Sequence, residues 1–533
     1  MTFHSDAWLA IVLLMVSIAL MFFARSSVRW HWAAVVVAGM ACVPLIQYGF
    51  GQIPFFGVAW INATYLLGLC TALLLGAYWE RASPGQCADF LFLALGLAGM
   101  VSVGIQIHQW LLFDSLEFWV NKALGRPYGN LGQPNQLATL LVLGLLGCSW
   151  GFVRKQLSAW SSILLAGFFL LGIALTQSRT GWLNVSIFIL AMFCWGWTRS
   201  QKRIMVTAVG LGTFFVVCVL GLSWLSDLLQ LTGAYDLSGR FSEQARPVIW
   251  RLLADAAWEK PWFGYGWGQT GFAHLQVAAS HPFLGVIFFE AHNLFLDLIL
   301  WNGIPLGVFV VVAMTWWLAA ATRAVKGVSD AILLLFLLVL GVHAMLEYPL
   351  HYAYFLLPAG LVAGVLNVRL KFRPAFISAH WVCMVVLLGS GAMLAVTVRD
   401  YIRVESSFAD LRFEKARIHT NNPGSAPELW VLTQLREMII FGRTEARPNM
   451  SDQELVWMRD VTKTYPSPYN AHKLALALAL NGQGVEAQLW LKNLCKAFPV
   501  QFCEGTRITW AQKALKEPAI AAVPWPANVD GAR

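Results

Sequence analysis

The sequence predicts an all-α, polytopic membrane protein, and two observations carry that prediction. Of its 533 residues, 58% are hydrophobic and only 12% are charged, whereas soluble domains carry about 25% charged residues. Apolar runs long enough for a membrane-spanning helix also recur along the chain. The net charge of +9 lies in the loops between these runs, so it bears on topology in a lipid bilayer and does not indicate a nucleic-acid partner.

About twelve transmembrane helices are expected, at 7–23, 33–50, 58–78, 88–108, 136–153, 158–176, 181–198, 204–225, 303–322, 329–346, 352–368 and 378–398. The first run lacks a basic flank and a small-residue cleavage site, so we expect a retained span and not a signal peptide. The chain then divides into spans 1–8 (1–225), a large loop (226–302), spans 9–12 (303–398) and a soluble helical domain (399–533).

Basic residues alternate between the predicted loops. The loops after the odd-numbered spans carry thirteen Lys and Arg, whereas the short loops after spans 2, 4, 6 and 10 carry three. Positively charged loops stay in the cytoplasm. Both termini, the 226–302 loop and the 399–533 domain are therefore expected on the opposite side of the membrane.

Every unusual polar segment falls on that outer side. These segments are GNLGQPNQ (129–136), TQSRTG (176–181), the large loop, His292 with Asn293, and EYPLHY (347–352). Turns are generally polar, but the cytoplasmic turns contain Lys and Arg and no comparable set of Gln, Asn, Tyr and His. A binding or catalytic site that faces outward explains this distribution better than ordinary turns do.

His292 and Asn293 stand at the head of an apolar, helix-period run beside the large loop. An imidazole exchanges protons near neutral pH. At the expected boundary between membrane and water, it could contact both a lipid-linked substrate and an aqueous one. A helix-capping or interfacial His is the simpler alternative for this stretch taken alone. Taken together with the other outer polar segments, a catalytic role for His292 is favoured.

The large loop contains an expected amphipathic helix at 246–258, which Pro261 ends. Its predicted apolar face consists of Ile249, Leu252, Leu253 and Ala256. The GYGWG stretch at 264–268 follows no strand and lacks the P-loop lysine, so it does not indicate a nucleotide site. Arg240, Arg246 and Arg251 precede it. Arginine forks match diphosphate oxygens, and solvated loop charge is the alternative interpretation.

The segment 465–499 predicts two amphipathic helices around the turn Asn481-Gly482, which resembles one tetratricopeptide-type helix pair. Cys495 and Cys503 lie in this soluble domain, and a disulfide between them is expected in an oxidising compartment. The other seven cysteines lie in or beside spans and are expected to be packing residues. No CxxC or HExxH pattern occurs, so we expect no metal and no cofactor.

Five outer segments in order resemble one known family: GNLGQPNQLA, TQSRTGW, RPVIW…PWFGYGWG, HNLFLDLILWNG and LEYPLHYAYFLLPAG. They are similar to motifs of bacterial protein O-oligosaccharyltransferases of the PglL type, in the superfamily of O-antigen ligases and polymerases. The resemblance covers roughly 120–370, with a ligase-like core at 170–305. The GQPN and EYPL motifs and the soluble C-terminal segment favour the protein-glycosylation branch.

The resemblance implies an inner-membrane enzyme that faces the periplasm and moves a glycan en bloc from undecaprenyl diphosphate to Ser or Thr of a pilin or other exported protein. It matches His292 to the family's essential histidine, Gln177 and Arg179 to its span-end residues, Tyr348 to its tyrosine, and Arg246 to its loop arginine. Arg240 and Arg251 are alternative matches for the loop arginine.

The chemistry suggests roles for these residues. Arg179 and Arg246 would stabilise the leaving diphosphate, and His292 would act as base, with Glu347 as the second candidate. Gln177, Asn135 and Tyr348 would orient sugar or phosphate, and Gln133 and Asn293 complete the candidate substrate-binding set. An O-antigen ligase or polymerase would use the same residues with a sugar acceptor. A transporter would instead carry ionisable residues inside its spans and show repeat symmetry.

Overall fold

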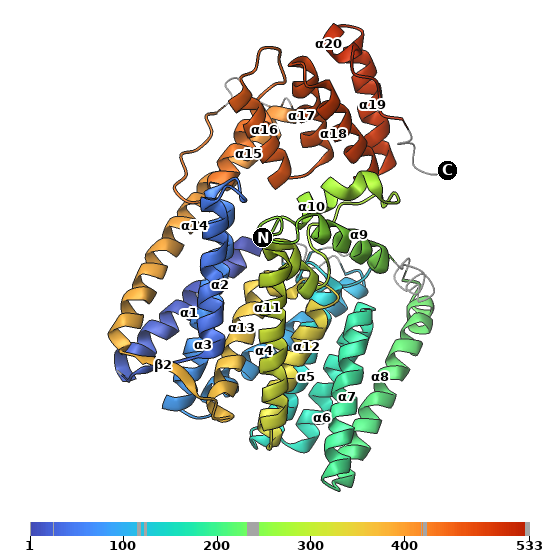
Figure 1. Cartoon of the computed structure of the whole chain (residues 1–533). Coiled ribbons are helices and arrows are strands. Elements are labelled where there is room, and N and C mark those ends of the chain that lie inside the picture. The colour runs from blue at the N-terminus through green and yellow to red at the C-terminus, as the bar shows by residue number, and fades with distance from the viewer. Residues whose placement is uncertain are drawn as a thin grey trace. The chain divides into compact units, whose positions relative to one another are not determined.

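The computed structural model describes residues 2–24, 26–113, 119–121, 125–231, 245–416, 418 and 424–527. Figure 1 shows that helices make up nearly all of the regular secondary structure in the described residues, which confirms the all-α prediction. The chain divides into two compact units. The first contains 1–35, 69–244 and 316–383, and the second contains 36–68, 245–315 and 384–533.

Within the described residues, ten helices are long and apolar enough to cross a membrane. They are α1 (Thr2–Ala24), α2 (Trp32–Gly49), α3 (Phe56–Ala82), α4 (Gln86–Trp110), α5 (Pro134–Val153), α6 (Ala159–Thr176), α7 (Arg179–Thr198), α8 (Lys202–Leu228), α11 (Leu294–Ala324) and α14 (His380–Ala416). Two shorter apolar helices, α12 (Val328–Ala344) and α13 (Ala353–Arg369), occupy the tenth and eleventh predicted spans. Each of the twelve predicted spans therefore corresponds to an apolar helix.

Two of these helices extend beyond the predicted spans. α11 begins at Leu294 because helix continues on both sides of a break at Gly303, whose φ of 78° and ψ of 168° are not helical. The predicted span began at 303, and Pro305 suits the first turn of the helical segment that follows the break. α14 continues to Ala416, since the more polar residues after 398 prolong the same helix.

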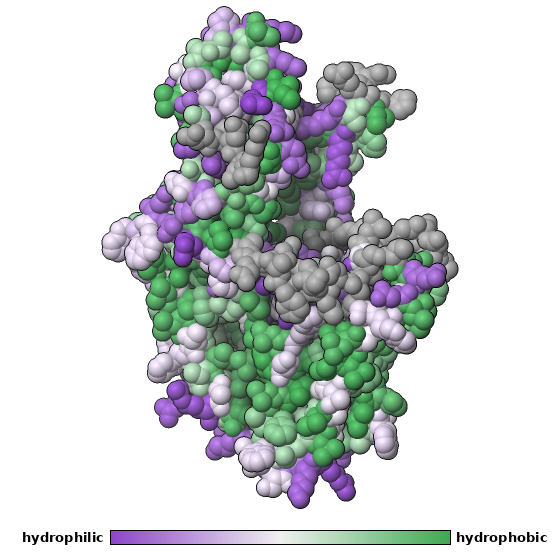
Figure 2. Space-filling view, turned by 90° about the vertical axis from the view of Figure 1, so that its right-hand side faces the viewer, coloured by the Kyte–Doolittle hydropathy of each residue, from purple (hydrophilic) through white to green (hydrophobic). Residues whose placement is uncertain are grey.

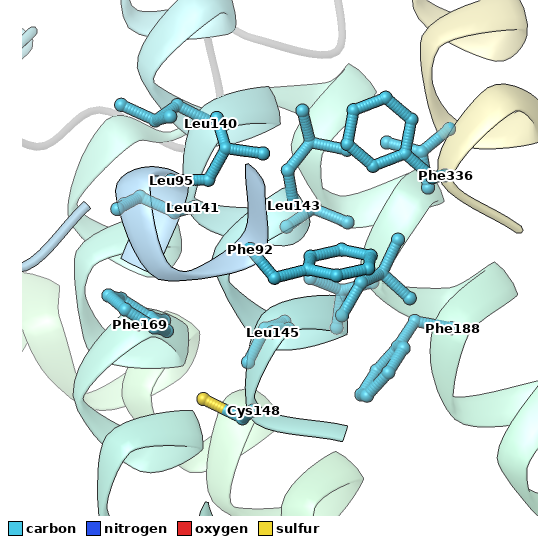
Figure 3. Close-up of a cluster of buried hydrophobic side chains, with 14 of the residues drawn as sticks. Phe92, Leu95, Leu140, Leu141, Leu143, Leu145, Cys148, Phe169, Phe188 and Phe336 are labelled. Carbon is cyan, nitrogen blue, oxygen red and sulfur yellow. The ribbon is translucent and has the colours of Figure 1, made fainter. Parts of the chain in front are cut away.

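α5 is the central helix of the first unit. Its buried leucines pack against aromatic rings from four neighbouring helices, as Figure 3 shows, namely Phe92, Phe169, Phe188 and Phe336. A Cβ at Gly144 would lie 3.0 Å from the Phe169 ring, so the missing side chain lets that ring approach closely. Because α5 is packed on all sides, the residues at its N-terminal end are held in place.

α8 turns an apolar face outward. Val206, Val217, Leu220 and Trp224 have 71%, 62%, 64% and 67% of their surface exposed. Figure 2 shows hydrophobic residues gathered over this side of the helices of the first unit. Lipid tails can cover such a surface, whereas water cannot without a large cost in free energy. The chain is therefore a multi-pass membrane protein.

A small antiparallel ribbon joins two predicted loops of the first unit. β1 (Val28–His31) pairs with β2 (Pro374–Ser378) in the register Val28↔Ser378, Arg29↔Ile377, Trp30↔Phe376 and His31↔Pro374, with an irregularity between Trp30 and His31. The Trp30 indole stacks on Phe376 and donates to the Ser378 hydroxyl at 3.0 Å. The ribbon links the ends of α1 and α13, which are far apart in sequence.

The second unit contains the helices of the large loop and of the C-terminal domain. These are α9 (Ala245–Glu259), α10 (Thr270–Val277), the 3-10 turn η2 (Ala278–Ser280), α15 (Thr433–Arg443), α16 (Asp452–Thr464), α17 (Pro468–Leu480), α18 (Gly484–Ala497), α19 (Val500–Ala514) and α20 (Pro518–Ala521). α17 and α18 form the predicted helix pair, with Gly482 in the turn at a φ of 80°. Leu275 and Ala278 belong to the hydrophobic core of the C-terminal helices, and α10 lies beside α18 in Figure 1. The large loop and the C-terminal domain therefore share one core.

Cys495 of α18 and Cys503 of α19 are joined as a disulfide, with Cα atoms 4.7 Å apart. The other seven cysteines are free thiols.

Candidate functional site

The start of α5 gathers polar side chains from three distant segments. Because Pro134 is the first helical residue, Gln133 is extended as the N-cap, with a φ of −140°. The Gln133 amide nitrogen donates to the Tyr348 hydroxyl at 2.7 Å, and the Asn135 amide nitrogen donates to Glu347 Oε1 at 3.1 Å. The Ser178 hydroxyl donates to Asn135 Oδ1 at 2.7 Å. We call Gln133, Asn135, Ser178, Glu347 and Tyr348 the α5 cap cluster.

Arg126 ties this cluster to the end of α6. Its Nε donates to the Thr176 carbonyl at 2.8 Å, and its Nη2 lies 3.4 Å from Asn135 Oδ1. Gln177 follows α6 as a buried residue with a left-handed φ of 50°. The α5 cap cluster is therefore linked to the TQSR turn by hydrogen bonds at Ser178 and, through Arg126, at Thr176. Arg126 is one of the three basic residues of the short outer loops, and nothing in its sequence context marked it as a candidate site residue.

Arg179 opens α7, directly after the N-cap Ser178, whose hydroxyl accepts from the Gly181 amide at 3.0 Å. The Arg179 side chain is exposed. The N-terminus of a helix carries partial positive charge and free backbone donors, so anions are favoured there. Arg179 adds a full positive charge at that helix start, beside the α5 cap cluster. This end of the first unit is therefore suited to a phosphate group.

The large-loop helix buries the predicted face. Ile249, Leu252, Leu253 and Ala256 are each at most 1% exposed, and this face packs in a core with residues of α2, α3 and α11 that belong to the same unit. Of the three candidate arginines, Arg246 is half-buried and Arg251 is exposed on α9. Arg240 lies outside the described residues.

The GYGWG turn packs against the break in α11. The Tyr265 amide donates to the Leu300 carbonyl at 2.7 Å, and the Gly266 amide donates to the Trp301 carbonyl at 3.2 Å. The Ile304 amide in turn donates to the Pro261 carbonyl at 2.7 Å. The break leaves helix carbonyls without their usual partners, and the turn supplies the missing donors. The glycine-rich stretch therefore completes the hydrogen bonding at the break in α11.

His292 and Asn293 form the junction between the large loop and α11. The Asn293 side-chain oxygen accepts from the amides of Phe295 at 3.1 Å and Leu296 at 3.3 Å, so Asn293 caps the helix. His292 is partly buried and has a left-handed φ of 50°, which few residues other than glycine adopt. The Phe288 ring meets the His292 ring edge-to-face, with centroids 5.7 Å apart.

Two buried residues beside this junction were missed by the sequence interpretation. Asp297 is 3% exposed and accepts from the Ala291 amide and the Thr270 hydroxyl. His274 is 1% exposed and accepts the Phe288 amide on Nδ1 at 3.1 Å. Burial, with a smaller contribution from the charge of His281, lowers the pKa of His274 to about 4, so it stays neutral and can accept. An acidic residue inside an apolar span was a usable signal for Asp297.

The predicted site residues fall into two groups, one in each unit. The first unit holds Gln133, Asn135, Gln177, Arg179, Glu347 and Tyr348. The second holds Arg246, Arg251, His292 and Asn293. Hydrogen bonds join Gln133 to Tyr348 and Asn135 to Glu347 within the first group. Within the described residues, no three or more His, Cys, Asp and Glu side chains are grouped as metal ligands.

Three family models match successive parts of the chain. A protein glycosylation ligase model matches 127–150, an O-antigen ligase model matches 162–312, and a model described as the C-terminal part of a virulence factor membrane-bound polymerase matches 331–512. The O-antigen ligase match contains Gln177, Arg179, Arg246 and His292. Together the three models cover both groups of candidate residues.

Two proteins of Acinetobacter baylyi are similar over long stretches. A general O-oligosaccharyltransferase is 30% identical over 516 residues, which is 91% of this chain and 88% of that protein. A ComP-specific O-oligosaccharyltransferase is 28% identical over 352 residues, which is 64% of this chain and 62% of that protein. The chain therefore belongs to the family of PglL-type protein O-oligosaccharyltransferases, enzymes that use a lipid-linked glycan donor and a protein acceptor, within the O-antigen ligase superfamily.

Proposed function

We propose that this protein transfers an oligosaccharide en bloc from undecaprenyl diphosphate to Ser or Thr hydroxyls of exported proteins such as pilin, at the periplasmic face of the bacterial inner membrane. The α5 cap cluster is the observation that carries this proposal. It joins the GQPNQ, TQSR and EYPL segments through side-chain hydrogen bonds and lies beside the exposed Arg179 at a helix start. Amide and hydroxyl groups next to a cationic helix start match a sugar linked to phosphate.

In the proposed reaction, the acceptor hydroxyl oxygen bonds to the anomeric carbon while the bond from that carbon to the phosphate oxygen breaks. The hydroxyl proton passes to a base, and the lipid diphosphate leaves with the bonding electrons. Negative charge grows on the diphosphate as the bond breaks, and preorganised cations stabilise it by several kcal/mol, about the cost of removing one oxyanion-hole donor. We assign this role to Arg179 and Arg246, with Arg251 and Arg240 as the alternative loop cations.

His292 is the proposed base for the acceptor hydroxyl, because an imidazole accepts a proton near neutral pH. The alternative role for the same ring is a contact with the diphosphate. Glu347 is the second candidate for the base, and Asn135 donates to its carboxylate. Gln133, Asn135, Gln177 and Tyr348 would orient the sugar or the phosphate. Asn293 holds the start of α11 in place next to His292.

The test is glycan transfer by the purified protein in liposomes from undecaprenyl-diphosphate-linked glycan. We expect His292→Ala to lower transfer by at least about 100-fold, as for loss of a general base, with unchanged yield and thermal unfolding. Loss of activity at low pH, with no activity in His292→Lys, identifies a base. Loss at high pH, with residual activity in His292→Lys, identifies a phosphate contact. Full transfer by folded His292→Ala would contradict both roles.

The acceptor class is tested in the same assay by offering pilin, lipid A core and free glycan side by side. We expect pilin to be glycosylated in preference to the two sugar acceptors. An O-antigen ligase would prefer lipid A core, and a polymerase would extend the free glycan. Either of those results would replace protein glycosylation as the function of this site.

A further inference from the structure

Two buried side chains hold residues that adjoin or contact His292. The first is Asp297, in the first turn of α11. Its carboxylate accepts from the Ala291 amide at 2.9 and 3.1 Å, and from the Thr270 hydroxyl at 2.8 Å. The Trp301 indole donates to the same Thr270 oxygen at 2.8 Å. These bonds fix the backbone amide of Ala291, the residue directly before His292, so they help to set the path by which the chain enters His292.

The second buried side chain is His274 of α10. Its Nδ1 accepts from the Phe288 amide at 3.1 Å, and its ring lies parallel to the Phe288 ring at 5.9 Å between centroids and 10° between planes. The Phe288 ring also contacts the His292 ring edge-to-face. His274 thus fixes both the backbone and the ring of the residue that touches His292.

We propose that Asp297 and His274 are positioning residues that hold the His292 imidazole in the orientation needed for glycan transfer. This inference rests on the proposed function, because it concerns how the proposed base is held. Asp297 acts on the backbone before His292, and His274 acts on the ring through Phe288. Neither residue needs to touch the substrate.

The backbone of His292 explains why such support is required. A residue with a side chain in the left-handed region is less stable than in the usual regions, and this conformation persists only where its surroundings hold it. Asp297 fixes residue 291 and Asn293 caps residues 295 and 296, so the chain is held on both sides of His292. A reacting group displaced by about 1 Å loses on the order of 100-fold in rate.

Matched substitutions separate the polar contacts from side-chain size. Asp297→Leu keeps the shape and removes every acceptor, whereas Asp297→Asn keeps one oxygen for the Ala291 amide and Thr270. His274→Leu removes the acceptor for Phe288, whereas His274→Asn places a side-chain oxygen near the position of Nδ1. We expect each Leu variant to lower kcat about 100-fold with KM for both substrates within about threefold, and each Asn variant to recover part of kcat.

Asp400 supplies the control for loss of a buried carboxylate in the same unit. It is fully buried and accepts from the amides of Trp430 and Val431 at 2.7 and 2.8 Å, away from His292 in the sequence and in its contacts. Asp400→Leu is expected to lower thermal stability as Asp297→Leu does, while kcat per folded molecule stays within about threefold of the native protein. A purely structural effect would change thermal stability and kcat per folded molecule alike in both variants.

A double-mutant cycle with His292→Ala decides whether the two residues act through His292. We expect Asp297→Leu and His274→Leu to cause no further loss of kcat in the His292→Ala background. Native kcat in folded Asp297→Leu and His274→Leu, with His292→Ala inactive, would overturn the positioning roles and leave the proposed function intact. An active His292→Ala protein would overturn the assignment of the base, and any loss in the Leu variants would then contradict action through His292.

Discussion

Single atoms at the α5 cap cluster carry the contacts between segments that are distant in sequence. The Tyr348 hydroxyl is one of them, since it accepts from Gln133 at 2.7 Å. The Tyr348 ring has separate contacts, stacking near Tyr352 at 6.2 Å and meeting His351 at 5.8 Å between centroids. The hydroxyl and the ring can therefore be tested independently.

We expect Tyr348→Phe to lower kcat about tenfold, the equivalent of about 1.4 kcal/mol, because it removes one hydrogen bond that positions Gln133 and keeps the ring contacts. Transfer kinetics measure this loss. Tyr78→Phe is the matched control, because the Tyr78 hydroxyl also accepts a hydrogen bond, from the Ser26 amide at 3.1 Å in the same unit. Equal kcat losses in both variants would show that the Tyr348 hydroxyl has no special role.

At the scale of elements, the GYGWG turn and the broken helix α11 are complementary. Gly264 lies so close to the break that a Cβ would stand 2.3 Å from the Leu300 carbonyl oxygen and 2.6 Å from the Gly303 nitrogen. Gly268, in the same turn, has a similar φ of 75° but its Cβ would meet nothing nearer than the Asn62 side chain at 3.5 Å. The two glycines share the backbone constraint and differ in the close approach.

The expected result is that Gly268→Ala lowers stability by about 1–2 kcal/mol, the cost of a left-handed alanine. Gly264→Ala should lower the free energy of unfolding by about 3 kcal/mol or more in total, because its Cβ also clashes with backbone atoms that cannot rotate away. Thermal unfolding and the yield of folded protein in detergent measure both variants. Equal losses of stability in the two variants would mean that the turn does not pack against α11 as described.

At the scale of the whole chain, the loops of the first unit fall into two sets that differ in charge, and contacts join the loops within each set. The basic loops that follow the odd-numbered spans contact one another or the ends of adjoining helices. Arg81 donates to the Ser27 carbonyl, and Arg199 donates to the Lys326 carbonyl. Arg154 pairs with Asp89, in the first turn of α4, at 2.9 Å. The loops that follow the even-numbered spans form a second set of contacts. Arg126 donates to the Thr176 carbonyl, and Gln133 donates to the Tyr348 hydroxyl. The alternation of charge along the sequence thus corresponds to two distinct sets of loops in the structure.

This grouping predicts the topology in the cell. Because the set containing Lys326 is strongly basic, we expect it in the cytoplasm and the C-terminus after Arg533 in the periplasm. Alkaline phosphatase fused after Arg533 should be active, and the same enzyme inserted at Lys326 should be silent. Activity at Lys326 with silence at Arg533 would reverse the sidedness of the whole proposed site.

Sequence-based prediction worked where the signal is local. The apolar face of α9 was predicted residue by residue and is buried, because helical periodicity depends on neighbours three and four positions apart. The predicted start of α11 was less accurate. Gly303 and Pro305 interrupt the helix, and the same residue types also occur where a helix begins, so the sequence does not distinguish the two cases. Sequence-based prediction missed Asp297 and His274, whose roles depend on contacts with Thr270 and Phe288 and not on any spacing.

By itself, the sequence determined that this chain is a helical membrane protein with thirteen basic residues on one set of loops and its polar motifs on the other. Apolar run length and charge are properties of composition along the chain, so they need no knowledge of packing. Only the tertiary structure decided that Gln133 contacts Tyr348, that Asn135 contacts Glu347, and that Asp297 accepts from the amide of Ala291, the residue before His292. Such contacts are hydrogen bonds of about 3 Å between groups that folding alone brings together.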